Sequence, residues 1–84
     1  MLDFKYLFGY NVLMNKFPNG HILGDCLRRM RKNAQLTQAE VADIIGVSRI
    51  SIIRWEAGLR TPSFAALCAF VEACNCELSE VVAG

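Results

Sequence analysis

The sequence predicts an all-α domain of five short helices, preceded by an N-terminal extension. Apolar residues recur with helical spacing from position 22 onward, and Thr37 and Ser48 each stand where a helix would begin. Gly46 lies between them, so almost no loop separates the second helix from the third. A chain of 84 residues makes one small domain. With 54% hydrophobic residues and two prolines, it is neither disordered nor rich in linkers.

Residues 1–20 form the extension, and residues 21–84 form the helical domain. Between Leu2 and Met14 every second residue is apolar, which is the period of a β-strand. A lone strand pairs with a second subunit, folds as a hairpin about Gly9, or stays loosely ordered. In an alternative interpretation the protein starts at Met14 and residues 1–13 do not belong to it.

The first two helices are expected at residues 22–33 and 38–45. Thr37 is placed to cap the second helix, and Glu40, three residues later, completes a capping box. The first helix is expected to bury one stripe of apolar residues: Leu23, Cys26, Leu27 and Met30.

A sharp corner is expected between the second and third helices. Gly46 can adopt the positive φ that ends a helix, and Ser48 can cap a third helix that begins at Arg49 and ends at Gly58. Two helices joined this closely are angled neighbours, as in a helix-turn-helix.

A fourth helix is expected after Ser63 or Thr61, with Asn75 as a left-handed terminator. Ser79 then caps a short fifth helix at residues 80–83. The buried stripe expected for the fourth helix consists of Phe64, Leu67, Cys68 and Val71.

Charge is distributed unevenly although the net charge is only +1. Seven basic and four acidic residues lie between His21 and Pro62, whereas only acidic residues, Glu72, Glu77 and Glu80, follow Pro62. One surface is therefore suited to a polyanion and another should avoid it.

The outward face of the third helix carries the candidate contacts. An arginine fork fits guanine O6 and N7, a serine reaches phosphate or base, and an isoleucine can lie against a thymine methyl. A solvated basic face is the alternative, but two apolar residues spaced i, i+3 beside arginines favour a binding patch. The residues not needed for the buried stripe through Val47, Ile52 and Trp55 are Ser48, Arg49, Ile50, Ser51, Ile53 and Arg54.

Residues 23–82 resemble the Cro/CI-type (XRE-like, lambda-repressor-like) helix-turn-helix family of phage and bacterial regulators. The landmarks appear in family order: Arg31, "LTQ" (36–38), Val41 and Ala42, "GVS" (46–48), Ile52, "WE" (55–56), Gly58 and Pro62. The resemblance implies five helices, with the second and third reading DNA. It also implies a sequence-specific double-stranded DNA-binding transcriptional regulator, acting as a homodimeric repressor.

The resemblance also implies roles for individual residues. Arg31 and Glu56 match an ion pair between the first and third helices, which makes them structural. Isoleucines at 50 and 53 replace residues that are usually polar, and Ala57 replaces a basic or amide residue, so the target sequence cannot be transferred. The implied base-reading residues are Arg49, Ile50 and Arg54, and the implied DNA-backbone contacts are Gln38, Ser48, Ser51 and Arg60.

A two-fold dimer would place two recognition helices about 34 Å apart in successive major grooves. Leu78, Val81 and Val82 form the candidate interface.

The alternative function is an antitoxin-like or coactivator-like interaction module whose main partner is another protein, such as a toxin. The N-terminal strand and the acidic end would then be its working surfaces.

The four cysteines are expected to be reduced structural thiols. Zinc sites usually show two cysteine pairs, whereas this chain has the single Cys74-Asn75-Cys76, so no metal is expected. A redox switch through Cys74 or Cys76 is the alternative.

No catalytic constellation and no cofactor motif are present, so no enzyme activity is expected. Without a leader or a run of about 18 apolar residues, the cytoplasm is the expected location.

Overall fold

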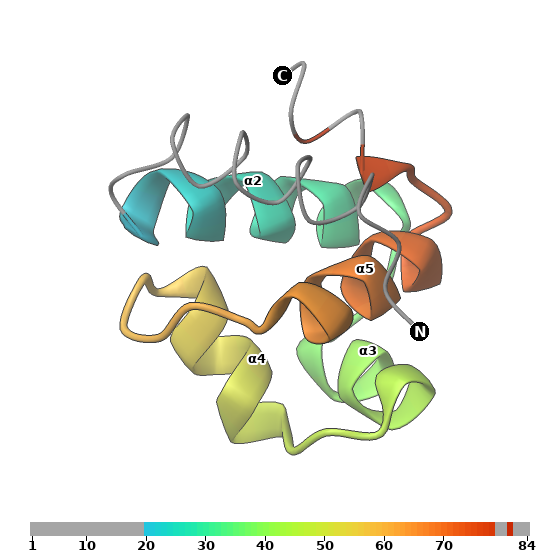
Figure 1. Cartoon of the computed structure of the whole chain (residues 1–84). Helices are drawn as coiled ribbons and strands as arrows, with labels where there is room; N and C mark the ends of the chain where they lie inside the picture. Colours follow the sequence, from blue (N-terminus) through green and yellow to red (C-terminus); the bar gives the residue numbers. More distant parts are fainter. Residues whose placement is uncertain (1–19, 79–80, 82–84) are drawn as a thin grey trace.

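The structure is a computed structural model that describes residues 20–78 and 81. This part of the chain folds into four α-helices without a strand. They are α2 (Gly20–Asn33), α3 (Gln38–Ile45), α4 (Arg49–Glu56) and α5 (Phe64–Ala73), labelled as in Figure 1. The predicted all-α class is confirmed for these residues. The predicted N-terminal strand and all but one residue of the predicted fifth helix lie outside them.

The predicted corner between α3 and α4 is confirmed in its details. The Glu40 N–H donates to Thr37 Oγ1 at 3.1 Å and the Thr37 N–H to Glu40 Oε1 at 2.9 Å, which completes the capping box. This bond from the Thr37 backbone lowers the pKa of the Glu40 carboxyl. Gly46 has φ +77°, and the Ser51 N–H donates to Ser48 Oγ at 3.2 Å. α4 therefore begins at Arg49, as predicted.

Each of the four described helices is followed by a left-handed residue just past its last turn. After α2 this residue is Gln35 (φ +60°), with bonds from the Leu36 N–H to the Arg31 carbonyl and from the Gln35 N–H to the Lys32 carbonyl. Asn75 (φ +57°) and Gly58 (φ +75°) lie in the same pattern after α5 and α4. These are Schellman caps. The one at Gln35 was not predicted, because glutamine seldom adopts this conformation.

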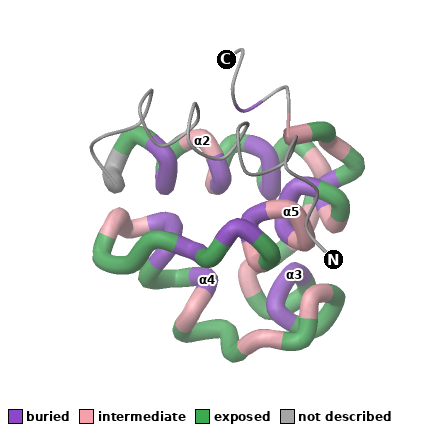
Figure 2. Tube along the Cα trace, viewed as in Figure 1, coloured by how far each residue is buried: buried purple, intermediate pink, exposed green. Residues whose placement is uncertain are grey.

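The helices pack around one core. α2 runs along one side of the molecule, and α3 and α4 form the corner on the opposite side (Figure 1). α3 packs against α4 and α5, while α2 packs against α4 and α5. Figure 2 shows the buried segments facing the space between the helices. The buried core cluster consists of Leu23, Leu27, Met30, Val41, Ala42, Ile52, Trp55, Leu67, Phe70, Val71, Cys74 and Val81.

The buried stripe of α5 differs from the prediction at two positions. Cys68 is only half-buried, and Phe70, which was not predicted, is 0% exposed. α5 is apolar on most of its circumference, so spacing alone did not determine which residues face inward. α5 turns the side with Leu67 and Phe70 toward α2 and α3, and Cys68 is left at its edge. Ser63 is the N-cap, accepting from the Ala66 N–H at 3.1 Å.

Candidate nucleic-acid interface

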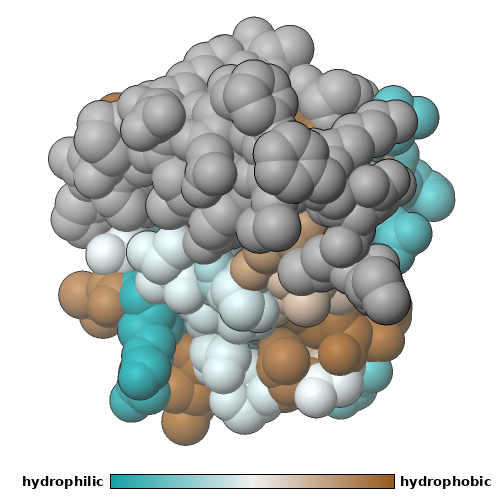
Figure 3. Space-filling model, viewed as in Figure 1, coloured by the Kyte–Doolittle hydropathy of each residue, from teal (hydrophilic) through white to brown (hydrophobic). Residues whose placement is uncertain are grey.

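α4 exposes one face that is both basic and apolar. Arg49, Ile50, Ile53 and Arg54 are exposed, whereas Ile52 and Trp55 are buried in the core. Ile50 and Ile53 are i, i+3 neighbours, and each has an arginine four positions away, so the four side chains form one continuous patch. Hydrophilic surface borders hydrophobic surface over α4 in Figure 3.

Two serines and the start of α3 flank this face. Ser48 is exposed and caps α4, and its Oγ lies 3.1 Å from the Oγ of half-buried Ser51. The Ser48 hydroxyl is therefore already engaged within the helix terminus. A shallow hollow connects the N-termini of α3 and α4, with Gln38 and Arg49 in its lining. The structure thus brings two of the predicted contact residues, one from each helix, to the same hollow.

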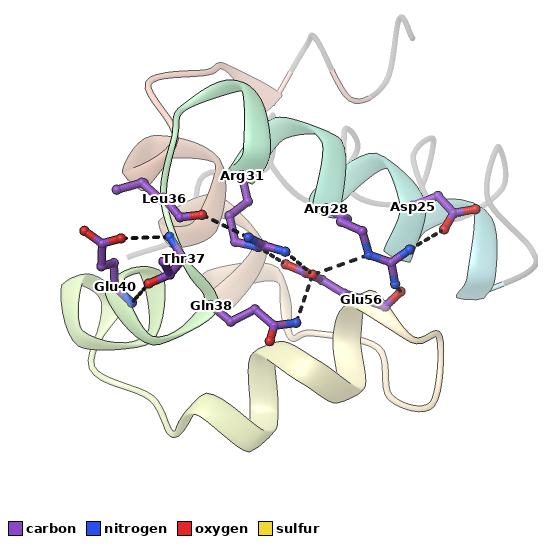
Figure 4. Close-up of polar contacts among 8 residues, drawn as sticks. All are labelled: Asp25, Arg28, Arg31, Leu36, Thr37, Gln38, Glu40 and Glu56. Atoms are coloured by element: carbon purple, nitrogen blue, oxygen red, sulfur yellow. Dashed lines mark hydrogen bonds and ion pairs between the residues drawn. The ribbon is translucent and has the colours of Figure 1, made fainter.

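Glu56, at the end of α4, is the centre of a buried polar cluster (Figure 4). Its side chain is 1% exposed and accepts two bonds from Arg31, from Nε at 2.6 Å and from Nη2 at 2.9 Å. The bonds to Glu56 raise the pKa of the Arg31 guanidinium against the opposing effect of burial. The third nitrogen of Arg31 donates to the Leu36 carbonyl at 2.9 Å. This pair joins α2, the connection after it, and α4.

Gln38 binds the same carboxylate, that of Glu56. Its Nε2 donates to Glu56 Oε1 at 3.2 Å, and its side chain is half-buried. The amide nitrogen that was expected to hold a phosphate is therefore directed into the cluster. Gln38 links the first turn of α3 to the last turn of α4, and its contact to DNA stays a prediction.

Two residues of α2 that were not predicted to do so, Gly24 and Arg28, also hold α4. Arg28 donates from Nη2 to the Glu56 backbone carbonyl at 3.1 Å, and its Nε lies 3.7 Å from Glu56 Oε1. At Gly24, a Cβ would lie 2.4 Å from that carbonyl oxygen and 2.7 Å from the carbonyl oxygen of Trp55. A lone glycine inside a helical pattern is the available signal for such a close approach.

The remaining predicted residues lie apart from this cluster. Arg60 is exposed in the connection after α4, where its N–H donates to the Arg54 carbonyl at 3.3 Å. Leu78 is half-buried against the core. Val81 is 0% exposed and belongs to the chain's own core, and its place in a dimer interface stays a prediction. Val82 lies outside the described residues.

The cysteines are free thiols, of which Cys74 is the most deeply buried. Burial raises the pKa of the Cys74 thiol to about 11 and also raises that of Cys68. Among the described side chains, no group of three or more His, Cys, Asp or Glu is arranged to hold a metal ion. Within the described part of the chain, every helix is too short or too polar to cross a membrane.

Comparison with known proteins agrees with this geometry. A helix-turn-helix family model matches residues 27–81, which is more than half of the chain. Neither the curated proteins nor the solved structures gave a match. The matched segment includes α3, the Gly46 turn, α4 and the Arg31–Glu56 pair. The chain belongs to the Cro/CI-type (XRE-like) helix-turn-helix family of DNA-binding regulators.

Proposed function

We propose that this chain is a sequence-specific, double-stranded DNA-binding repressor that acts as a homodimer and reads the major groove with α4. The observation that carries the proposal is the composition of the exposed face of α4. It presents two arginines and two isoleucines, while the only carboxylate of the helix, Glu56, is 1% exposed and paired with Arg31. A polyanion can approach such a face without meeting an acidic group from the same helix.

The assignment of residues rests on the family resemblance, and most of these residues lie on or directly beside α3 and α4. The proposed base-reading residues are Arg49, Ile50 and Arg54, and the proposed backbone contacts are Gln38, Ser48, Ser51 and Arg60. Asp43 is exposed in the second turn of α3, so that part of the helix is unsuited to phosphate, whereas Glu40, in the first turn, is bonded to Thr37 in the capping box. DNA contact is therefore proposed for α4 and for the N-terminus of α3, beside the hollow that Gln38 and Arg49 line.

A homodimer is proposed because one short helix reads only a few base pairs. Two copies related by a two-fold axis would engage half-sites about 34 Å apart. Val81 is buried, so Leu78 is the more accessible of the two candidate interface residues that the structure describes. Analytical ultracentrifugation of Leu78→Asp should show monomers, whereas a wild-type protein that is itself monomeric, on and off DNA, would contradict the dimer.

The central experiment is in vitro selection of random duplexes, followed by affinity measurements with the enriched duplex. We expect one enriched sequence with two related half-sites. Affinity should fall about tenfold or more between about 50 and 200 mM salt, because bound phosphates release counterions. An unenriched pool combined with salt-insensitive binding would contradict DNA reading. Capture of a stable protein partner by the same preparation would then favour the interaction-module alternative.

A further inference from the structure

The exposed face of α4 contains an apolar pair enclosed by two cationic side chains. Ile50 is 56% exposed and Ile53 is 37% exposed. On a helix, Ile53 neighbours Arg49 and Ile50 neighbours Arg54, each at i, i+4. The two isoleucines therefore form a diagonal with one arginine on either side. We call these four residues the α4 patch.

The fold does not require either isoleucine. The inward side of α4 is supplied by Ile52 and Trp55, which are 0% and 8% exposed, and Glu56 anchors its end. Charged or polar side chains at 50 and 53 would leave these contacts intact. Exposed apolar surface that is adjacent and flanked by charges marks an interaction site.

The chemistry of the DNA major groove offers one apolar partner on the base edges. All four bases present hydrogen-bonding groups there, and thymine alone adds a methyl group, at C5. Cytosine methylated at C5 presents the same group at the same place. An arginine fork matches the O6 and N7 of guanine.

We propose that Ile50 and Ile53 recognise the C5-methyl groups of pyrimidines in the major groove, next to guanines contacted by Arg49 and Arg54. This inference rests on the proposed function, and it specifies the chemistry of the bases that are read. Each half-site contains at least one methyl-bearing pyrimidine adjacent to guanine. Removing one such methyl group weakens binding roughly fourfold, the value of one buried methyl-sized group.

The test uses the full chain and the duplex enriched by in vitro selection. Each thymine is replaced in turn by deoxyuridine, which removes only the methyl group and keeps Watson–Crick pairing. Dissociation constants are measured by fluorescence anisotropy. Wild-type protein should bind about fourfold more weakly at one or two substituted positions in each half-site, and equally well at the others.

Variants connect this effect to the two isoleucines. Ile50→Ala or Ile53→Ala should bind the thymine and deoxyuridine duplexes equally at the position that each side chain contacts. Both residues are exposed on a helix and alanine favours helix, so these variants should fold. Ile44→Ala is the matched control, since Ile44 is 59% exposed on α3 and should leave the methyl effect unchanged.

Replacing each cytosine with 5-methylcytosine distinguishes the two methyl sources. Tighter binding of the methylated duplex, lost in Ile50→Ala or Ile53→Ala, assigns the site to methylated cytosine, and deoxyuridine sensitivity assigns it to thymine. An enriched duplex that responds to neither replacement overturns the inference and leaves the proposed function standing. An absence of any enriched duplex overturns the proposed function and this inference with it.

Discussion

Arg31 and Glu56, 25 positions apart in the chain, form a two-bond ion pair that joins α2 to the end of α4. The carboxylate is 1% exposed and the guanidinium side chain 10% exposed, so neither partner is well hydrated. A buried charge that loses its partner is costly. The pair therefore holds α4 in its place relative to α2 and the rest of the domain.

Arg31→Met should destabilise the fold by about 3–5 kcal/mol, because Glu56 would stay buried without its main partner. Urea denaturation measures the change in the free energy of unfolding. Arg29→Met is the matched control, since Arg29 is exposed on the same helix, and it should change stability by less than about 0.5 kcal/mol. Equal losses in both variants would show that the buried pair has no special role.

Gly24→Ala should destabilise the protein by about 1–3 kcal/mol, the usual cost of overpacking. The added Cβ would overlap the Glu56 carbonyl oxygen, and this outweighs the helix preference of alanine, which is about 1 kcal/mol. Gly46→Ala is the contrast, because a Cβ there meets nothing within 4 Å and only the positive φ opposes it. Asparagine tolerates a positive φ better than alanine does. Gly46→Asn should therefore be more stable than Gly46→Ala, whereas Gly24→Asn should be no more stable than Gly24→Ala. Wild-type stability in Gly24→Ala would contradict the close approach.

Gln35→Gly should stabilise the protein by about 0.5–1 kcal/mol. Gln35 is exposed and holds φ +60°, a conformation that costs a glutamine energy and costs a glycine none. The left-handed cap after α2 would then form with less strain, which thermal unfolding would register as a higher midpoint. Gln35→Ala, which keeps a Cβ at the same φ, serves as the control and should not gain stability.

Arg49→Ala should lose about 1–3 kcal/mol of binding energy on the enriched duplex and relax specificity at one base pair. Arg29→Ala removes the same charge from α2 and is the matched control. Gln38→Ala, proposed as a backbone contact, should weaken all sequences alike. Because Gln38 also bonds to Glu56, the free energy of unfolding of the Gln38→Ala variant must be measured alongside its affinity for DNA. Identical losses for Arg49→Ala on specific and random duplexes would refute base reading by Arg49.

Stability should decline as pH rises from about 9 to 11. The Cys74 thiol ionises near its ordinary pKa of 9.0 in the unfolded chain, but burial raises its pKa to about 11 in the folded chain. Its stabilising contribution is fully present below 9.0 and is lost as pH rises through the folded value, by up to about 2–3 kcal/mol. Urea denaturation between pH 8 and 11 measures this decline. Cys74→Ala should show a shallower decline, and an unchanged slope would exclude this thiol as its cause.

The raised pKa of Cys74 also predicts that its thiol is slow to react. A thiol that is protonated at neutral pH and 4% exposed is a poor nucleophile. Alkylation of Cys74 in the folded protein should therefore be much slower than in urea. Rapid alkylation of Cys74 in the folded protein would contradict this prediction and favour the alternative that Cys74 acts as a redox switch.

Local signals predicted the corner of the domain well. The boundaries of α3, the capping box at Thr37, the left-handed Gly46 and the cap at Ser48 all depend on residues within a few positions of one another. Such interactions are encoded in short stretches of sequence. The buried face of α4 and the exposure of Ile50 and Ile53 also followed from helical spacing.

Positions that depend on distant segments were not predictable from these signals. The choice of Phe70 over Cys68 as a core residue depends on how α5 rotates against α2 and α3. The burial of Val81 depends on how the chain after α5 returns to the core. The bond from Arg28 to Glu56 was not predicted, because the two residues lie 28 positions apart in the chain.

The sequence by itself determined where helices begin and end around the turn, and which side chains of α4 are left over for a ligand. Helix capping, the positive φ of a glycine and the helical period each depend on residues that are close in sequence, so they do not depend on how the helices pack. The Arg31–Glu56 pair was expected from the family resemblance, but only the tertiary structure showed the other contacts that hold α4. The close approach of α2 at Gly24 and the bonds from Arg28 and Gln38 to Glu56 form between helices, where packing and desolvation act on residues far apart in the chain.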